Sequence, residues 1–363
     1  MIGRDWRQFG CSDSFLNRPD TPLFSHHDTK VFAMPKVICT ALNTNDGPHI
    51  KILHDAGFEV IPVPKGISIY ENANLIPLVR DCVAVVTGSE PWPDNVLAEC
   101  PKLRVLSRTG VGFDAIDMAA ADRRRVIVAT TPGVNHHAVA EHTIALMFGI
   151  GRGFPKQDQQ VRKCAWTREA TPRILGTTLG LVGLGRIGQA VATRAVGLGM
   201  KVVAYEPFPN REFVEKWRLE LLSLDQLLSR SDYVSLHLPV GPETKHIMNA
   251  ATFAKMKPGS VIINTARGLL IDENALVAAL QSGHLRGAGL DVFEVEPLPS
   301  TSPLLTMSNV LMSGHVAGLD HESHRDTLTM CAETIVTLSQ GGWPTECIRN
   351  MAGVTDWKWS EKG

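Results

Sequence analysis

The stretch TLGLVGLGRIGQAVATRAVGLGMKVVAYEP, residues 178–207, decides the fold class of this chain. Gly183, Gly185 and Gly188 form a G-x-G-x-x-G pattern that follows an apolar run and opens a segment of helical period. In such a unit the first glycine permits a tight turn, the second lets a pyrophosphate approach the backbone, and the third lets the helix pack closely on the strand. The stretch therefore predicts a strand, a tight turn and a helix whose N-terminus binds a dinucleotide.

An acidic residue follows the second strand of this unit. The run KVVAY is followed directly by Glu206. A carboxylate at this position accepts hydrogen bonds from a ribose diol and repels a 2′-phosphate. The sequence therefore predicts NAD as the cofactor in preference to NADP, although Arg211 lies close enough along the chain to leave some use of NADP open.

The rest of the chain repeats the alternation of strand and helix. Short apolar runs alternate with segments of helical period from Lys36 onward, and a long helical segment at 136–154 separates two series of strands. Near-continuous apolar runs suit strands that are buried on both faces of a parallel sheet. We therefore expect an α/β fold with two doubly wound parallel-sheet domains, a Rossmann NAD-binding domain and a flavodoxin-like substrate domain.

The domain boundaries follow from the same pattern. We expect the substrate domain at residues 36–137, completed by an amphipathic helical segment at 321–350, and the NAD-binding domain at 138–320. Residues 1–35 are polar and lack periodicity, so we expect a poorly ordered extension there, or a true start of translation at Met34. Residues 351–363 are expected to form a tail.

Composition excludes several classes of function. The 36 Lys and Arg residues nearly balance the 37 Asp and Glu residues, so no net field favours nucleic acid or an anionic membrane surface. The seven cysteines never form a C-x-x-C pair, which indicates reduced and mostly buried thiols. No apolar run is long enough to span a bilayer. We therefore expect a cytoplasmic protein with a small-molecule substrate and neither a nucleic-acid nor a membrane partner.

Three further strands of the second series end in polar residues. The stretches NTARG, LDVFEVEP and MSGHVAG place Arg267, Glu296 and His315 after predicted strands. Because ligands of open parallel sheets collect at the carboxyl ends of the strands, these side chains can converge on the cofactor. Histidine suits proton exchange with an alkoxide, a carboxylate can orient it, and arginine can bind a substrate carboxylate. The three groups together indicate an oxidoreductase of 2-hydroxy acids.

The motifs also resemble a known family in their order along the chain. The series PKLRVLSRTGVGFDAIDMAAA, GLVGLGRIGQA, HLPVGPETKHIMN, MKPGSVIINTARGLLIDENAL, GAGLDVFEVEPLP and SGHVAG closely resembles the D-isomer-specific 2-hydroxyacid dehydrogenases, especially the 3-phosphoglycerate-dehydrogenase-like branch. The resemblance covers roughly residues 36–350 and rests on several independent motifs.

The resemblance implies a role for each matching residue. It assigns the substrate-gripping arginine to Arg267, the glutamate that pairs with the histidine to Glu296, and the acid/base to His315. It implies a carboxylate-binding loop for the substrate at Thr87, Gly88 and Ser89. It implies contacts to NAD from Gly183, Gly185, Arg186, Ile187, Gly188, Glu206, Thr265, Ala266 and Asp291. It also implies a homodimer built around the long helix between the domains.

The chain departs from the family pattern at a few positions. Ala115 stands where the family usually has Asn, and Gly314 stands where a proline usually precedes the histidine. No Arg or Lys occurs between Val83 and Leu97, which argues against a strongly phosphate-selective site. The substrate can thus be 3-phosphoglycerate or an unphosphorylated acid such as glycerate, hydroxypyruvate or glyoxylate. The alternative from another class is a non-catalytic NAD-sensing binding protein of the corepressor type.

The stretch VNHHAVAEHT, residues 134–143, holds three histidines and a glutamate, but its spacing does not suit a metal site. His137 and Glu141 share a helix face, whereas His142 points about 140° away from His137 on an ideal helix. We therefore expect no metal here, and expect Asn135 to be the N-cap of the long helix. A weaker hypothesis is that His136 or His137, at the edge of the cleft, helps to select the substrate.

Overall fold

The computed structural model describes residues 34–41, 45–354 and 356–360. The extension expected at 1–35 lies almost entirely outside the described residues, as does the end of the expected tail. Two sheets, of five and seven strands, carry the fold, and every strand pairing in both is parallel.

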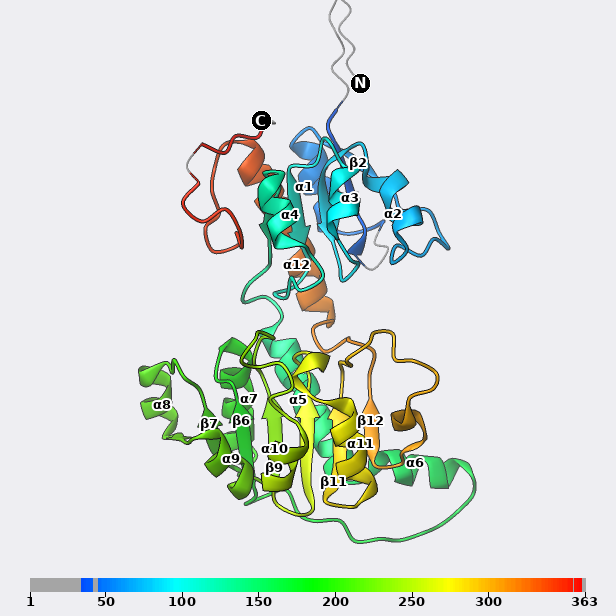
Figure 1. The fold of residues 1–363 in the computed structure, drawn as a ribbon, viewed down its shortest axis with the longest axis vertical. Helices are drawn as coiled ribbons and strands as arrows, with labels where there is room; N and C mark the ends of the chain where they lie inside the picture. Colours follow the sequence, from blue (N-terminus) through cyan, green and yellow to red (C-terminus); the bar gives the residue numbers. More distant parts are fainter. Residues whose placement is uncertain (1–33, 42–44, 355, 361–363) are drawn as a thin grey trace, which may run out of the picture. The chain divides into compact units, whose positions relative to one another are not determined.

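The first sheet has the strand order β2-β1-β3-β4-β5. Its strands are β1 (Lys36–Cys39), β2 (Glu59–Ile61), β3 (Cys82–Thr87), β4 (Val105–Arg108) and β5 (Ile127–Ala129). The helices between them are α1 (Pro48–Asp55), α2 (Asn72–Val79), α3 (Asp94–Ala98) and α4 (Met118–Arg123). The last helix of the chain, α12 (His321–Ser339), packs on α1, β3 and β4 and so completes one face of this sheet (Figure 1).

The second sheet has the strand order β12-β11-β10-β9-β6-β7-β8. Its strands are β6 (Thr178–Val182), β7 (Lys201–Tyr205), β8 (Glu220–Leu221), β9 (Tyr233–Leu236), β10 (Ser260–Asn264), β11 (Leu285–Leu290) and β12 (Val310–Met312). The strand order reverses direction between β6 and β9, and this is the topological switch point at which doubly wound sheets bind nucleotides.

Helices cover both faces of the second sheet (Figure 1). The helices of this part of the chain are α5 (His136–Gly151), α6 (Phe154–Arg162), α7 (Arg186–Gly197), α8 (Arg211–Trp217), α9 (Leu224–Arg230), α10 (Ala250–Lys255) and α11 (Glu273–Gln281), of which α6 contacts α5 and lies beyond the sheet. Short 3₁₀ turns lie at Gly268–Leu270 and Pro303–Thr306. The long helical segment predicted at 136–154 is the helix α5, which ends at Gly151, and α6 begins at Phe154, the last residue of the predicted range.

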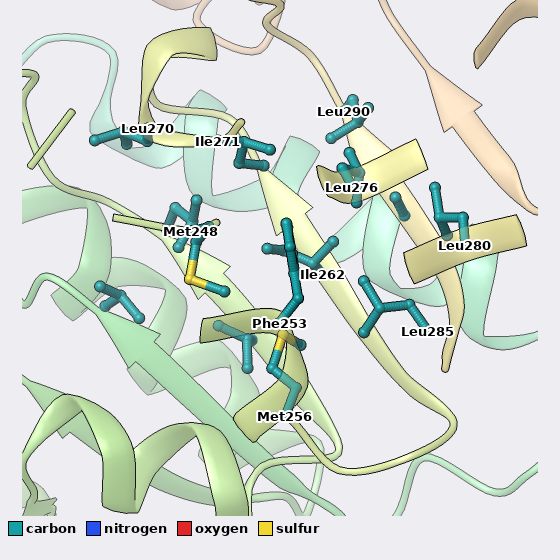
Figure 2. Close-up of a cluster of buried hydrophobic side chains, with 14 of the residues drawn as sticks. Met248, Phe253, Met256, Ile262, Leu270, Ile271, Leu276, Leu280, Leu285 and Leu290 are labelled. Atoms are coloured by element: carbon teal, nitrogen blue, oxygen red, sulfur yellow. The ribbon is translucent and has the colours of Figure 1, made fainter. Parts of the chain in front are cut away.

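The apolar runs of the sequence are strands whose side chains are buried on both faces. Every residue of β9 and β10 is buried. One core lies under α5 and α7, and another lies where side chains from α10, α11 and β10 meet (Figure 2). Because helices cover each face, the ends of the strands are where polar side chains can face a ligand.

Candidate active site

The glycine loop lies between β6 and α7, at the switch point of the second sheet. Gly183 has a φ of 104°, and a Cβ on it would lie 2.7 Å from the backbone of His237. A Cβ on Gly188 would lie 2.3 Å from the carbonyl oxygen of Gly183. Both positions therefore admit only glycine. No side chain caps the N-terminus of α7, so its N–H groups are left for an anion such as a diphosphate.

Glu206 lies against this loop. One of its carboxylate oxygens accepts a hydrogen bond from the N–H of Leu184, inside the loop, at 2.8 Å, and the other accepts from the N–H of Phe208 at 3.0 Å. Each oxygen has further lone pairs, which suit the two hydroxyls of a ribose. The glycine loop, the uncapped helix and this carboxylate fit a dinucleotide without a 2′-phosphate.

A cavity of about 790 Å³ adjoins the loop and brings together residues from both sheets. The residues predicted to contact cofactor or substrate that line it are Gly88, Ser89, Ile187, Thr265, Ala266, Arg267, Asp291 and His315. A second cavity, of about 250 Å³, shares Arg267 and His315 with the first and adds Glu296. The remaining predicted residues, Thr87, Gly183, Gly185, Arg186, Gly188 and Glu206, line neither cavity.

His315 and Glu296 form a hydrogen-bonded pair. Nδ1 of His315 lies 2.7 Å from Oε2 of Glu296, and Oε1 of Glu296 accepts a hydrogen bond from the N–H of Phe293 at 3.0 Å. Burial raises the pKa of Glu296, but the hydrogen bonds from His315 and Phe293 and the charges of His315 and Arg267 outweigh it, so this pKa lies below its usual value. A carboxylate at Nδ1 leaves Nε2 of His315 as the nitrogen available to a substrate.

The backbone around His315 is held by Asp291, which is fully buried. The N–H of His315 donates to the carbonyl oxygen of Asp291 at 2.7 Å. The Asp291 carboxylate accepts from the N–H groups of Val316 and Ala317 at 3.0 and 2.9 Å, and from the hydroxyl of Ser313 at 2.6 Å. Asp291 therefore fixes the loop that carries the histidine, in addition to the cofactor contact predicted for it.

Arg267 reaches across to the first sheet. Its Nε lies 2.6 Å from Oδ2 of Asp114, in the GVGFD segment that follows β4. Its guanidinium lies against Gly112, where a Cβ would come within 1.4 Å of Nη2. The sequence did not reveal Asp114 as the partner of this arginine. A substrate carboxylate at Arg267 would compete with Asp114 for the guanidinium.

The predicted substrate loop is organised by a residue that the sequence analysis did not single out, Glu90. Gly88 donates its N–H to the Glu90 carboxylate at 2.9 Å, and the Thr87 hydroxyl donates to it at 2.5 Å. The Thr87 hydroxyl also accepts from the indole N–H of Trp92 at 2.7 Å, so Thr87 faces the interior of the first sheet. The Ser89 hydroxyl lies 2.8 Å from the hydroxyl of Tyr70, and both residues line the larger cavity.

Arg108 is a cation of the site that the sequence analysis missed. The loop between Val83 and Leu97 carries no Arg or Lys, as the sequence shows, but Arg108 at the end of β4 lines both cavities. Burial and the nearby charge of Arg267 lower its pKa to about 10, so it stays charged at neutral pH. Its one hydrogen bond within the described residues goes to the carbonyl oxygen of Thr109, at 2.7 Å.

One of the three histidines in the stretch 134–143, His142, contacts the loop that carries His315. Nε2 of His142 lies 2.7 Å from the Ser313 hydroxyl that donates to Asp291. The rings of His136 and His137 are 4.1 Å apart, and neither residue lines a cavity. Among the residues that the structure describes, no three His, Cys, Asp or Glu side chains are grouped so as to hold a metal ion. Nor is any helix in this part of the chain long and apolar enough to cross a membrane.

Comparison with known proteins gives a consistent result. Residues 144–317 match the family described as D-isomer specific 2-hydroxyacid dehydrogenase, NAD binding domain. The chain is 40% identical over 289 residues to D-3-phosphoglycerate dehydrogenase of Mycobacterium tuberculosis, covering 79% of this chain but 54% of the relative. It thus spans about half the length of that relative. It is 37% identical to glyoxylate reductase of Korarchaeum cryptofilum, covering 76% of this chain and 85% of the relative.

A solved structure shares the fold over nearly its whole length. The crystal structure of the TT0316 protein from Thermus thermophilus superposes with a TM-score of 0.79 and is 34% identical, covering 86% of this chain and 99% of that one. The match extends over both sheets.

Proposed function

Because this chain belongs to the D-isomer-specific 2-hydroxyacid dehydrogenase family and carries its NAD-binding domain, we propose that it transfers a hydride between NAD and C2 of a small D-2-hydroxy acid or 2-keto acid. The observation that carries this proposal is the His315–Glu296 pair, which shares a cavity with Arg267. His315 and Arg267 also line the larger cavity, together with Thr265, Ala266 and Asp291, which are predicted to contact the cofactor.

His315 is the proposed acid/base. When the hydroxy acid is oxidised, Nε2 of His315 takes the proton of the C2 hydroxyl while the hydride leaves C2, and bound NAD supplies the acceptor for that hydride. In the reverse direction His315 returns the proton to the alkoxide. Glu296 holds Nδ1, which fixes the orientation of the ring.

Arg267 is the proposed carboxylate-binding residue. Its planar guanidinium can bind a carboxylate with two parallel hydrogen bonds once Asp114 releases it. Nη2 of Arg267 lies so close to Gly112 that a residue with a Cβ at position 112 would collide with the guanidinium. Binding of substrate in exchange for Asp114 would place C2 between Arg267 and His315, which is the proximity that the reaction needs.

The two halves of the site divide the work. We propose that residues 36–137 with 321–350 form the substrate domain and residues 138–320 the NAD-binding domain.

We also propose a homodimer. Its support is that individual large apolar side chains in and after α6 are exposed, namely Phe154, Trp166 and Leu175. Sedimentation velocity of the wild type and of Trp166→Ser tests the dimer, and a wild type that sediments as a monomer would refute it.

The test of the activity is turnover of NADH with a panel of 2-keto acids, before and after His315→Asn. We expect the substitution to lower kcat by about 10²- to 10⁴-fold while the Kd for NADH stays within about twofold. Glu296→Gln should lower kcat less, since the acid/base remains. A wild type that binds NADH tightly but turns over no member of the panel would instead indicate the NAD-sensing alternative.

A second candidate substrate is a phosphorylated acid such as 3-phosphoglycerate, and Arg108 is the observation that favours it. A charged guanidinium that lines both cavities without a carboxylate partner can receive a phosphate. Values of kcat/KM for 3-phosphoglycerate and for glycerate, measured side by side, decide between the two candidates.

A further inference from the structure

Glu90 is a buried carboxylate in the wall of the larger cavity. Only 1% of its surface is exposed. It accepts hydrogen bonds from the Thr40 and Thr87 hydroxyls and from the N–H of Gly88. A Cβ on Gly88 would lie 3.0 Å from the Glu90 carboxylate, so the loop fits closely around it. Nothing in the proposed proton or hydride transfer uses this group.

The other charges that line the larger cavity have nearby partners. Arg267 pairs with Asp114, and Asp291 is satisfied by the N–H groups of its own loop. Glu90 and Arg108 remain, and neither forms an ion pair within the described residues. They line the same cavity, and the charge of Glu90 partly offsets the burial that lowers the pKa of Arg108.

Building on the proposed function, we propose that Glu90 is a specificity-determining residue that disfavours a phosphate on C3 of the substrate. A phosphate carries roughly −1.5 to −2 charges at neutral pH, and a nearby carboxylate repels it more strongly inside a protein cavity than in bulk water. Glu90 also occupies the N–H of Gly88, which a phosphate would otherwise use.

The other polar groups near Glu90 in the cavity wall suit an uncharged substituent on C3 of the substrate. They are the hydroxyls of Ser89 and Tyr70, which already hydrogen-bond each other and can each both donate and accept. A hydroxyl on C3 matches them. Specificity would then come from a repulsive element against phosphate as much as from contacts to the preferred substrate. In the wild type the charge of Glu90 offsets that of Arg108, which makes Arg108 a weaker receptor for a phosphate than it would be without Glu90.

The experiment compares kcat/KM for 3-phosphoglycerate and for glycerate, with NAD, in the wild type and three variants. We expect the wild type to prefer glycerate. Glu90→Gln keeps the size of the side chain and one acceptor for Gly88, and we expect it to raise the ratio in favour of 3-phosphoglycerate by about tenfold or more. Adding Arg108→Met to Glu90→Gln should remove that gain, because the gain depends on the cation that Glu90 no longer balances.

The third variant, Glu99→Gln, is the matched control. This glutamate lies in the same half of the chain, and its side chain is half exposed in a surface ion pair with Arg80, so its ratio should stay at the wild-type value. The Kd for NADH should be unchanged in every variant, since Glu90 lies outside the glycine loop.

Two results would overturn the assignment of Glu90. One is a wild type that prefers 3-phosphoglycerate by more than about tenfold, which needs no variant to fold. The other is a ratio that stays within about twofold in Glu90→Gln while thermal unfolding and NADH binding match the wild type. A failure of the proposed function looks different, because neither acid would then be turned over by any of the four proteins.

Discussion

The backbone of His315 adopts a conformation that asparagine or glycine would adopt more readily. Its φ of 56° lies in the left-handed region, which costs a residue with a Cβ about 1–3 kcal/mol. Four hydrogen bonds to Asp291 hold it there, one to the main-chain carbonyl and three to the carboxylate. The position of the proposed acid/base thus depends on a neighbouring aspartate as well as on Glu296.

Replacing that aspartate tests the dependence. In Asp291→Asn a carboxylate oxygen becomes an NH₂ group, which cannot accept from the loop N–H groups. We expect the free energy of unfolding, measured in urea, to fall by about 1–3 kcal/mol. We also expect kcat to fall, because the loop that carries His315 becomes less well fixed. The control is Asp225→Asn, which removes an exposed ion pair with Lys255 and should cost less than about 1 kcal/mol. Equal losses in the two variants would contradict this role of Asp291.

The His315–Glu296 pair also makes a prediction about pH. The pKa of Glu296 is lowered in the folded protein, so the ionised form stabilises the fold above its unfolded pKa, and this contribution is lost as the pH falls through the folded value. The difference in unfolding free energy between wild type and Glu296→Gln should therefore persist from neutral pH down to about 4.5 and shrink below it. Urea titrations across this range measure it, and a difference that already shrinks well above pH 4.5 would refute the pairing.

The sequence predicted the position of a site residue where that residue directly follows a strand of the second sheet. Arg267 and His315 line a common cavity, as their places after two strands of the second sheet suggested. Glu90, Arg108 and Asp114 were missed because they belong to the first sheet, and the sequence does not show which of its strand ends face the second. The pairing of Arg267 with Asp114 joins residues that are far apart in the chain, and no local pattern marks it.

The helix α7 and the glycine loop before it act as one element. Gly188→Ala would place a methyl group 2.3 Å from the Gly183 carbonyl oxygen, so the helix must move away from the loop. We expect a loss of about 1–3 kcal/mol in unfolding free energy and a Kd for NADH raised by more than about tenfold. Gly197→Ala at the end of the same helix meets no atom within 4 Å and should be neutral or slightly stabilising. NADH fluorescence titration of both variants makes the comparison, and wild-type affinity in Gly188→Ala would contradict it.

The start of α5 shows what helical periodicity can and cannot foresee. The spacing predicted that His142 points away from His137, and in the structure His142 contacts Ser313 whereas His137 lies near Arg194. The contact itself could not be predicted, because it needs the position of β12. Asn135 precedes the helix as expected, but its side chain makes no capping hydrogen bond. The short strands β2 and β8 were also missed, since runs of two or three residues have no readable period.

At the scale of the whole molecule, the buried thiols give a direct test of packing. Burial raises the pKa of Cys39, Cys82 and Cys331 to about 12, and Cys100 and Cys347 are buried as well. Cys164 is exposed. We expect Cys164→Ser to remove one fast-reacting thiol from the native protein in a titration with Ellman's reagent, whereas the five buried thiols should react only after urea is added. Rapid reaction of a buried thiol in the folded protein would show that the first sheet opens.

The division of the chain into two parallel sheets was predictable as a whole, because strand periodicity and the glycine fingerprint act within short segments. The order of the strands within each sheet was not predicted and comes from the structure. The sequence did not predict which side chains of the first sheet line the cavity together with those of the second.

The return of α12 to the first sheet has a consequence for synthesis of the protein on the ribosome. The strands of the first sheet are made first, yet the residues of α12 that complete one of its cores, such as Leu328 and Ile335, are made after the last strand of the second sheet. One core of the first sheet therefore stays incomplete until the end of the chain has been made. Until α12 leaves the ribosome, the face of the first sheet that it covers stays exposed and apolar. Chaperones that bind apolar surfaces can therefore bind this face during synthesis of residues 130–320.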